Sequence, residues 1–211
     1  MENTKRNRVR GKGPKRNQLA IFKKLGEVSD ETYEYLNNFL NENTHSDIGT
    51  DAYSITRSCD YENVFNVGQK YRQIILQKDK TNNNVTIDEH DYDKWIPGSE
   101  LAQEEIKRFF KKIYRFRVSE MQPKHSLNWH IDTDTSVICR AQICLNENDS
   151  DFLFKDRKGI HKLRMEPKEF WFINTGWPHT VENHTDDVRR VAIMSFDYSD
   201  LRKDLQEELK L

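Results

Sequence analysis

Two hydrophobic patterns divide the chain near residue 116. In the first half, Tyr33, Leu36 and Leu40 follow a helical spacing within residues 29–43, which begin with a capping Ser-Asp pair. A second amphipathic helix is predicted over residues 99–114. Its apolar stripe, which we expect in the core, consists of Leu101, Ile106, Phe109, Phe110 and Ile113.

Strands are predicted mainly beyond Phe116, where short runs of β-branched and aromatic residues recur between turn residues. The runs are residues 116–121, 126–132, 136–145, 151–156, 161–166, 169–174, 179–183 and 189–198. This spacing is typical of an antiparallel sandwich or barrel of about eight strands. One earlier strand is predicted at residues 70–77, and leucines on one face predict a C-terminal helix over residues 199–211. The expected fold class is therefore α+β.

The length of 211 residues suits one domain, and the net charge of -1 argues against a polyanion binder. The charge is uneven, because residues 1–18 hold seven Lys/Arg and one Glu. We expect residues 1–18 to be a basic disordered tail and residues 19–211 to be one domain. A solubilising tail is favoured over a nucleic-acid contact, since no aromatic residues are interleaved for stacking.

The three cysteines, Cys59, Cys139 and Cys144, show no pairing pattern, which favours a reducing compartment. No apolar run reaches the roughly 18 residues of a membrane-spanning helix, and no apolar segment follows the basic N-terminus as in a secretory signal. We therefore expect a cytoplasmic protein without a membrane partner.

Residues 128–136 (NWHIDTDTS) hold the candidate chemistry, because His130, Asp132 and Asp134 alternate along a predicted strand. Crowding carboxylates beside an imidazole is costly unless a cation offsets it. His179 begins another short strand, and in a barrel two such strand ends can meet. His130, Asp132 and His179 would then form a facial triad with three open metal positions, as in non-haem Fe(II) oxygenases. Asp134 shares the face and is the alternative ligand.

Arg189 and Arg190 open a strand ten residues beyond His179. An arginine inside a β-core is costly unless it meets an anion, and its planar fork matches a carboxylate. The two side chains point to opposite faces, so only one of them can reach a central cavity.

Together these motifs resemble the Fe(II)/2-oxoglutarate-dependent dioxygenase superfamily over roughly residues 116–198, and most resemble its aspartyl/asparaginyl β-hydroxylase-like branch. That branch carries R-x-H on the strand after the first ligands, where this chain has Arg140-Ala141-Gln142. The substitution by Gln142 alters a hydrogen bond to the co-substrate or substrate. Retention of Asp132 argues against the halogenase subset. The implied fold is a double-stranded β-helix (a cupin-like jelly roll) with supporting N-terminal helices.

The resemblance implies Fe(II) as the metal and 2-oxoglutarate and O2 as co-substrates, with succinate and CO2 as products. The expected substrate is an amino-acid side chain, either of a free amino acid or in a polypeptide, so the expected partner is a small-molecule or peptide substrate. Arg189 is favoured over Arg190 as the clamp on the distal carboxylate of 2-oxoglutarate. Arg140 and Gln142 are the other co-substrate contacts, although a structural salt bridge is the alternative for Arg140. Two other functions stay open: a cupin-like metalloenzyme that does not use 2-oxoglutarate, and a binding protein acting through its basic tail.

Overall fold

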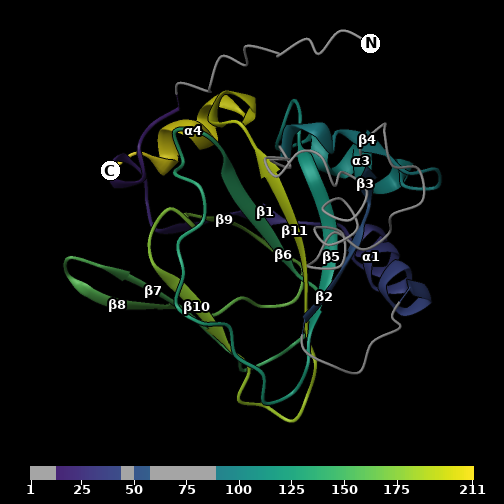
Figure 1. Cartoon of the computed structure of the whole chain (residues 1–211). Helices are drawn as coiled ribbons and strands as arrows, with labels where there is room; N and C mark the ends of the chain where they lie inside the picture. The colour runs from purple at the N-terminus through teal and green to yellow at the C-terminus, as the bar shows by residue number, and fades with distance from the viewer. Residues whose placement is uncertain (1–12, 44–49, 58–88) are drawn as a thin grey trace, which may run out of the picture.

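The computed structural model describes residues 13–43, 50–57 and 89–211 (Figure 1). The predicted strand at residues 70–77 and Cys59 lie outside these residues. No helix of the described part is long and apolar enough to cross a membrane.

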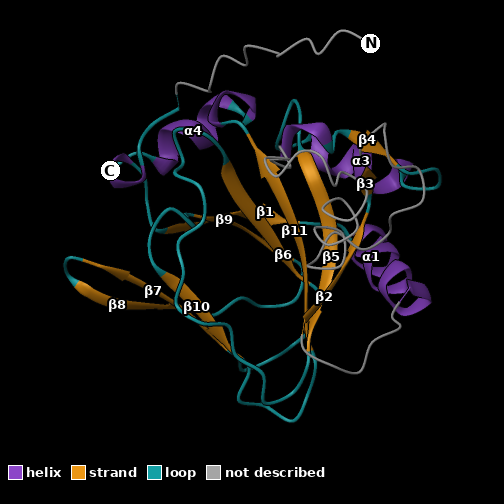
Figure 2. Cartoon of the chain, viewed as in Figure 1, coloured by secondary structure: helices purple, strands orange, loops and turns teal. Residues whose placement is uncertain are grey.

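The largest element is a six-stranded antiparallel sheet, with strand order β1-β9-β6-β11-β5-β2. Its strands are β1 (Phe22–Glu27), β2 (Thr50–Ser54), β5 (Tyr114–Met121), β6 (Cys139–Cys144), β9 (Glu169–Ile173) and β11 (Arg189–Phe196). A second sheet of order β10-β7-β8 consists of β7 (Asp151–Asp156), β8 (Gly159–Leu163) and β10 (His179–Glu182). A short ribbon pairs β3 (Thr56–Arg57) with β4 (Lys94–Trp95). The small sheet stands to one side of the large one (Figure 2).

Two apolar clusters follow from this arrangement. The larger cluster fills the space between the outer face of the large sheet and the helices, and it includes the fully buried Leu36, Phe116 and Phe172. The smaller cluster, which includes Phe152 and Val181, lies between the two sheets. The α+β jelly-roll prediction is therefore confirmed. Strands β1 and β2 also belong to the main sheet, so this sheet includes residues that precede the strands predicted beyond Phe116.

The helices agree with the hydrophobic pattern where their stripe is buried. The first, α1 (Asp30–Asn43), starts where Ser29 Oγ accepts the backbone N–H of Thr32 at 3.3 Å, and the last, α4 (Lys203–Leu209), buries its leucines. The middle helix, α3 (Glu100–Lys107), ends seven residues earlier than predicted. Its Leu101 is 45% exposed, while Ala102 is buried in its place, so the predicted stripe was wrong at that position. Single-turn helices are η1 (Arg16–Gln18), η2 (Glu89–Asp91) and η3 (Tyr198–Asp200).

Residues 126–132 do not form the predicted strand. They pair with β10 through two isolated bridges, Ser126 with Glu182 and His130 with His179, and the Leu127 N–H donates to Val181 O at 2.9 Å. These contacts do not form a continuous ladder, so the alternation of the segment was misread as a strand.

The predicted disordered tail extended too far, because residues 13–16 pack on the domain. Gly13 N donates to Ser136 O at 3.2 Å, and the Thr135 hydroxyl donates to Pro14 O at 2.9 Å. The Arg16 guanidinium donates to Gly176 O at 2.5 Å and lies 4.9 Å from the centre of the Trp177 ring. We call residues 13–16 the N-terminal clasp. Backbone carbonyls and one cation form these contacts, so the low apolar content of the segment gave no sign of them.

Candidate metal centre

Backbone pairing sets His130 beside His179. Each residue donates its N–H to the carbonyl of the other, at 3.0 and 2.9 Å. Two residues on, the Asp132 N–H donates to Thr175 O at 3.0 Å, which ties the loop after His130 to the loop before His179. These few bonds bring together residues that are nearly 50 positions apart in the sequence.

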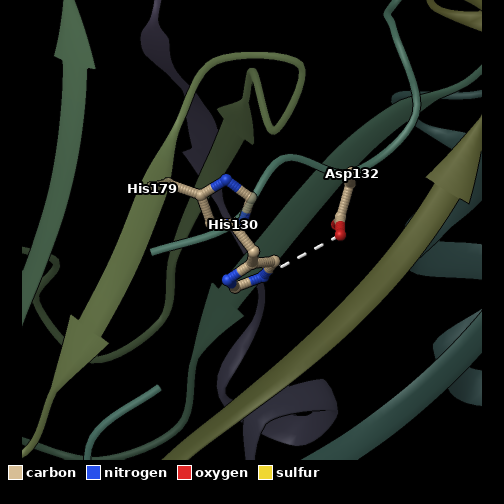
Figure 3. Close-up of side chains that lie close together, drawn as sticks. All are labelled: His130, Asp132 and His179. Atoms are coloured by element: carbon tan, nitrogen blue, oxygen red, sulfur yellow. Dashed lines mark ion pairs between the residues drawn. The ribbon is translucent and has the colours of Figure 1, made fainter. Parts of the chain in front are cut away.

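The three predicted ligands converge on one point (Figure 3). One potential donor atom from each of His130, Asp132 and His179 lies within 4.8 Å of the others. His130 Nε2 is 3.8 Å from Asp132 Oδ1, and the two imidazole rings have centroids 4.2 Å apart. Two imidazoles and one carboxylate form the donor set that suits a first-row divalent metal and leaves positions open for other ligands.

The tautomers of both histidines favour metal binding. His130 Nδ1 lies 2.7 Å from Asn128 O, and His179 Nδ1 lies 3.0 Å from Trp177 O. A carbonyl oxygen can only accept, so both Nδ1 atoms carry the proton, and Nε2 keeps its lone pair in the neutral ring. Burial lowers the pKa of His179 and so favours the neutral form that a metal requires.

Asp134 faces away from this point of convergence. Its Oδ1 accepts the Ser136 N–H at 2.9 Å, and its backbone carbonyl accepts the N–H groups of Val137 and Ile138. Asp134 therefore stabilises a turn, and it does not line the cavity beside the triad.

Arg140 lies behind Asp132 in a buried ion-pair network. Its Nε is 3.6 Å from Asp132 Oδ2, and its two terminal nitrogens donate to the two oxygens of Glu89 at 2.5 Å each. Ser195 hydrogen-bonds to both partners of this pair. Burial raises the pKa of Glu89, but the charge and hydrogen bonds of Arg140, followed by Arg115 and Ser195, hold it well below its ordinary value. Arg140 therefore makes the salt bridge that was its alternative interpretation, and in doing so orients Asp132.

A cavity of about 130 Å³ opens beside the triad, between the two sheets. Its walls include Gln142, Phe152, Thr175 and Arg189. An apolar cavity of roughly 150 Å³ can hold a benzene-sized molecule, so the space suits a small organic ligand.

Arg189 enters this cavity from β11 and is only 7% exposed. Within the described chain its contacts are weak: Gln142 Oε1 at 3.4 Å and the face of Phe152 at 5.7 Å. Burial lowers its pKa to about 10. No carboxylate of the described residues lies within 4.0 Å of it, so the guanidinium is buried without a counter-charge.

Arg190 takes the opposite side of β11. It pairs with the buried Glu120 at 2.8 Å and donates to Asn41 at 3.0 Å, and it does not line the cavity. The structure thus separates the two adjacent arginines as the strand alternation predicts.

Sequence reasoning missed Glu89 and Arg117. Glu89 lies in η2, more than 50 residues from its partner Arg140, and no motif marks it. Arg117 did carry a signal, because Arg117, Ser119 and Met121 alternate on one face of β5 and all three line the cavity. A charged residue on an inward strand face is unusual enough to attract attention.

Comparison with known proteins places the fold. AviO1 from Streptomyces viridochromogenes Tue57 superposes with a TM-score of 0.51 and 12% identity, over 86% of this chain and 91% of its own. A 2OG-Fe(II) oxygenase family protein from Burkholderia pseudomallei gives 0.51 and 11% identity, over 83% of each chain. HygX from Streptomyces hygroscopicus, solved with nickel, 2-oxoglutarate and hygromycin B, gives 0.49 and 8% identity, over 85% of this chain and 83% of its own.

No family model matches the sequence, and no curated protein matches it. At these identities the shared feature is the fold. The chain has the jelly-roll fold that the Burkholderia member of the 2OG-Fe(II) oxygenase family also has.

Proposed function

We propose that this protein is an Fe(II)- and 2-oxoglutarate-dependent oxygenase that hydroxylates an amino-acid side chain, in a small molecule or in a peptide. The observation that carries the proposal is the combination of two features in one cavity. One is the His130–Asp132–His179 set with both Nε2 lone pairs available, and the other is the buried cation of Arg189, which has no carboxylate partner among the described residues. A facial triad alone serves several metals and reactions. An arginine in the same cavity adds the requirement for an anionic co-substrate.

Each residue has a defined task in this proposal. His130, Asp132 and His179 hold the metal, and the carbonyls of Asn128 and Trp177 fix the rings that bind it. A ferrous ion held there would supply O2 activation coupled to decarboxylation of 2-oxoglutarate to succinate and CO2.

The protein's other residues bind and orient. Arg189 would bind the distal carboxylate of 2-oxoglutarate, and Gln142 supports its guanidinium from the adjacent strand. Phe152 and Val181 line the cavity and exclude water, which strengthens this pairing. Arg140 holds Asp132 in position through its Nε.

A reducing, cytoplasmic location is part of the same proposal. It is supported by Cys139 and Cys144, which are buried free thiols.

The test is anaerobic purification, loading with Fe(II), and measurement of succinate release with and without 2-oxoglutarate across amino acids and peptides. Co(II) binding, followed by its visible spectrum, gives a second readout that does not need turnover. His130→Ala, Asp132→Ala and His179→Ala should each lose succinate release and weaken Co(II) binding, whereas Asp134→Asn should bind Co(II) as the wild type does.

Two outcomes would replace the proposal. Metal binding without succinate from any substrate would favour a cupin-like metalloenzyme that does not use 2-oxoglutarate. Wild-type function in cells for His130→Ala, together with loss of function on deletion of residues 1–12, would favour a binding protein acting through its basic N-terminal residues.

A further inference from the structure

A second cation, Arg117, lines the same cavity as Arg189. In the pairing of β5 with β11, Arg189 lies opposite Met121, whereas Arg117 lies opposite Ile193. Arg117 and Met121 are four residues apart along one strand, which corresponds to about 13 Å at the usual rise. The two arginines therefore enter the space beside the metal ligands from well-separated backbone positions.

Arg117 has no carboxylate partner within the described chain. Among the described residues, its guanidinium makes one hydrogen bond, from Nη1 to Arg115 O at 3.3 Å. Glu89 and Asp132 are its acidic neighbours, but Glu89 is engaged by Arg140 and Arg115, and Asp132 belongs to the metal triad. Burial, followed by the charges of Arg115 and Arg140, lowers the pKa of Arg117 well below its ordinary value.

A count of the charges also indicates that the cavity attracts an anion. Within the part of the chain that the structure describes, the ionic groups in and beside the cavity are Arg115, Arg117, Arg140 and Arg189, with Glu89 and Asp132. Four cations against two anions leave an excess of two positive charges. A divalent metal would add two and the dianion 2-oxoglutarate would remove two, so the excess would persist in the loaded site. Such a site attracts a further anion.

We propose that Arg117 binds a carboxylate of the substrate, so that the substrate is an acid held between the metal and Arg117. This inference rests on the proposed function, because it names the substrate class for the same cavity. Arg140 does not compete for this role, since Glu89 engages both of its terminal nitrogens. Arg189 does not compete either, because the proposed function assigns it to the distal carboxylate of 2-oxoglutarate. The Arg117 fork can form paired, charge-assisted bonds to a carboxylate that an amide of the same shape cannot reproduce.

The experiment compares two small probes that differ in charge but hardly in shape, acetate and acetamide. The full-length protein is loaded with Zn(II) and 2-oxoglutarate, and binding of each probe is followed by ligand-observed NMR at constant ionic strength. Loading of 2-oxoglutarate is checked from its own signals in the same samples. The variants are Arg117→Gln and, as the matched control outside the cavity, Arg190→Gln, and thermal melts verify that both are folded.

We expect saturable acetate binding and no comparable acetamide binding to the wild type and to Arg190→Gln. Loss of a charge-assisted hydrogen-bonding partner should weaken acetate binding roughly 10- to 100-fold in Arg117→Gln. Equal binding of acetate to wild type and Arg117→Gln, equal binding of both probes, or no acetate binding would each overturn the inference. Failure of 2-oxoglutarate to load would instead count against the proposed function, and the acetate comparison would then be made on the Zn(II) form.

Discussion

Replacing Arg189 by methionine should stabilise the metal-free and ligand-free protein. Arg189 is buried, with one weak hydrogen bond to Gln142 and an aromatic contact in place of a carboxylate. Methionine keeps the length of the side chain and removes the charge. A residue that is costly in the free protein is what a site awaiting an anionic ligand requires.

The magnitude follows from the lowered pKa. Burial takes the pKa of Arg189 from 12.5 to about 10, and each unit corresponds to about 1.4 kcal/mol, so the buried charge costs about 3 kcal/mol. Because the folded state disfavours the cation, this cost is present at every pH below about 10. Losing the Gln142 and Phe152 contacts offsets about 1 kcal/mol of the gain. The net expectation is a gain of about 1 to 3 kcal/mol, or roughly 2 to 10 °C in Tm.

The assay is urea and thermal unfolding of wild type, Arg189→Met and Arg190→Met in the absence of ligands. Arg190→Met is the control, because Arg190 is a partner of the buried Glu120 carboxylate and its loss should destabilise by roughly 1 to 3 kcal/mol. The two neighbouring substitutions should therefore have opposite signs. With Zn(II) present, 2-oxoglutarate should raise the Tm of wild type but not of Arg189→Met. Destabilisation by Arg189→Met comparable to that of Arg190→Met would refute the reasoning.

Two further predictions concern groups around the triad. Arg16→Ala should weaken Co(II) binding about tenfold, because Arg16 supports the loop before His179. Deletion of residues 1–12 and Lys15→Ala are the controls, and neither should weaken Co(II) binding. Unchanged Co(II) affinity in Arg16→Ala, measured by competition with a chelator, would contradict a role for the clasp. Glu89→Gln should destabilise by about 3 to 5 kcal/mol at pH 7, since it leaves Arg140 buried with a neutral partner. The pKa of Glu89 is depressed, so its stabilisation is fully present above its unfolded value of 4.5 and falls as pH drops toward the folded value. Unfolding curves of wild type and Glu89→Gln should therefore converge below about pH 4, and a constant difference between pH 7 and pH 3 would disprove the assignment.

The parts of the fold with a buried apolar period were predictable from the sequence. Leu36 and Leu40 marked α1, and the β-branched and aromatic runs marked β5 to β11, because burial selects these side chains directly. The sequence FKKLGE of β1 has no apolar alternation, so the strand gave no signal, although it pairs with β9 at the edge of the main sheet.

The residues of the candidate site likewise fall into those that the sequence predicted and those that it did not. His130, Asp132 and His179 were predictable because metal ligands have a fixed chemistry and spacing, and the structure brings them together. The Arg140–Glu89 pair and the N-terminal clasp depend on contacts between polar groups that are far apart in the sequence. Such contacts produce no periodic pattern from which they could be predicted. Arg117 was visible in the alternation of β5 but had no motif to draw attention to it.

The N-terminal clasp has a consequence for the order in which the protein matures. Arg16 contacts Gly176, which lies 160 positions later in the sequence. The carbonyl of Pro14 likewise accepts a hydrogen bond from Thr135, which lies 121 positions later. Contacts of such long sequence separation form late in folding. We therefore expect the loops on both sides of the metal ligands to reach their final positions only after Gly176 has emerged from the ribosome, so that metal capture follows the formation of these long-range contacts.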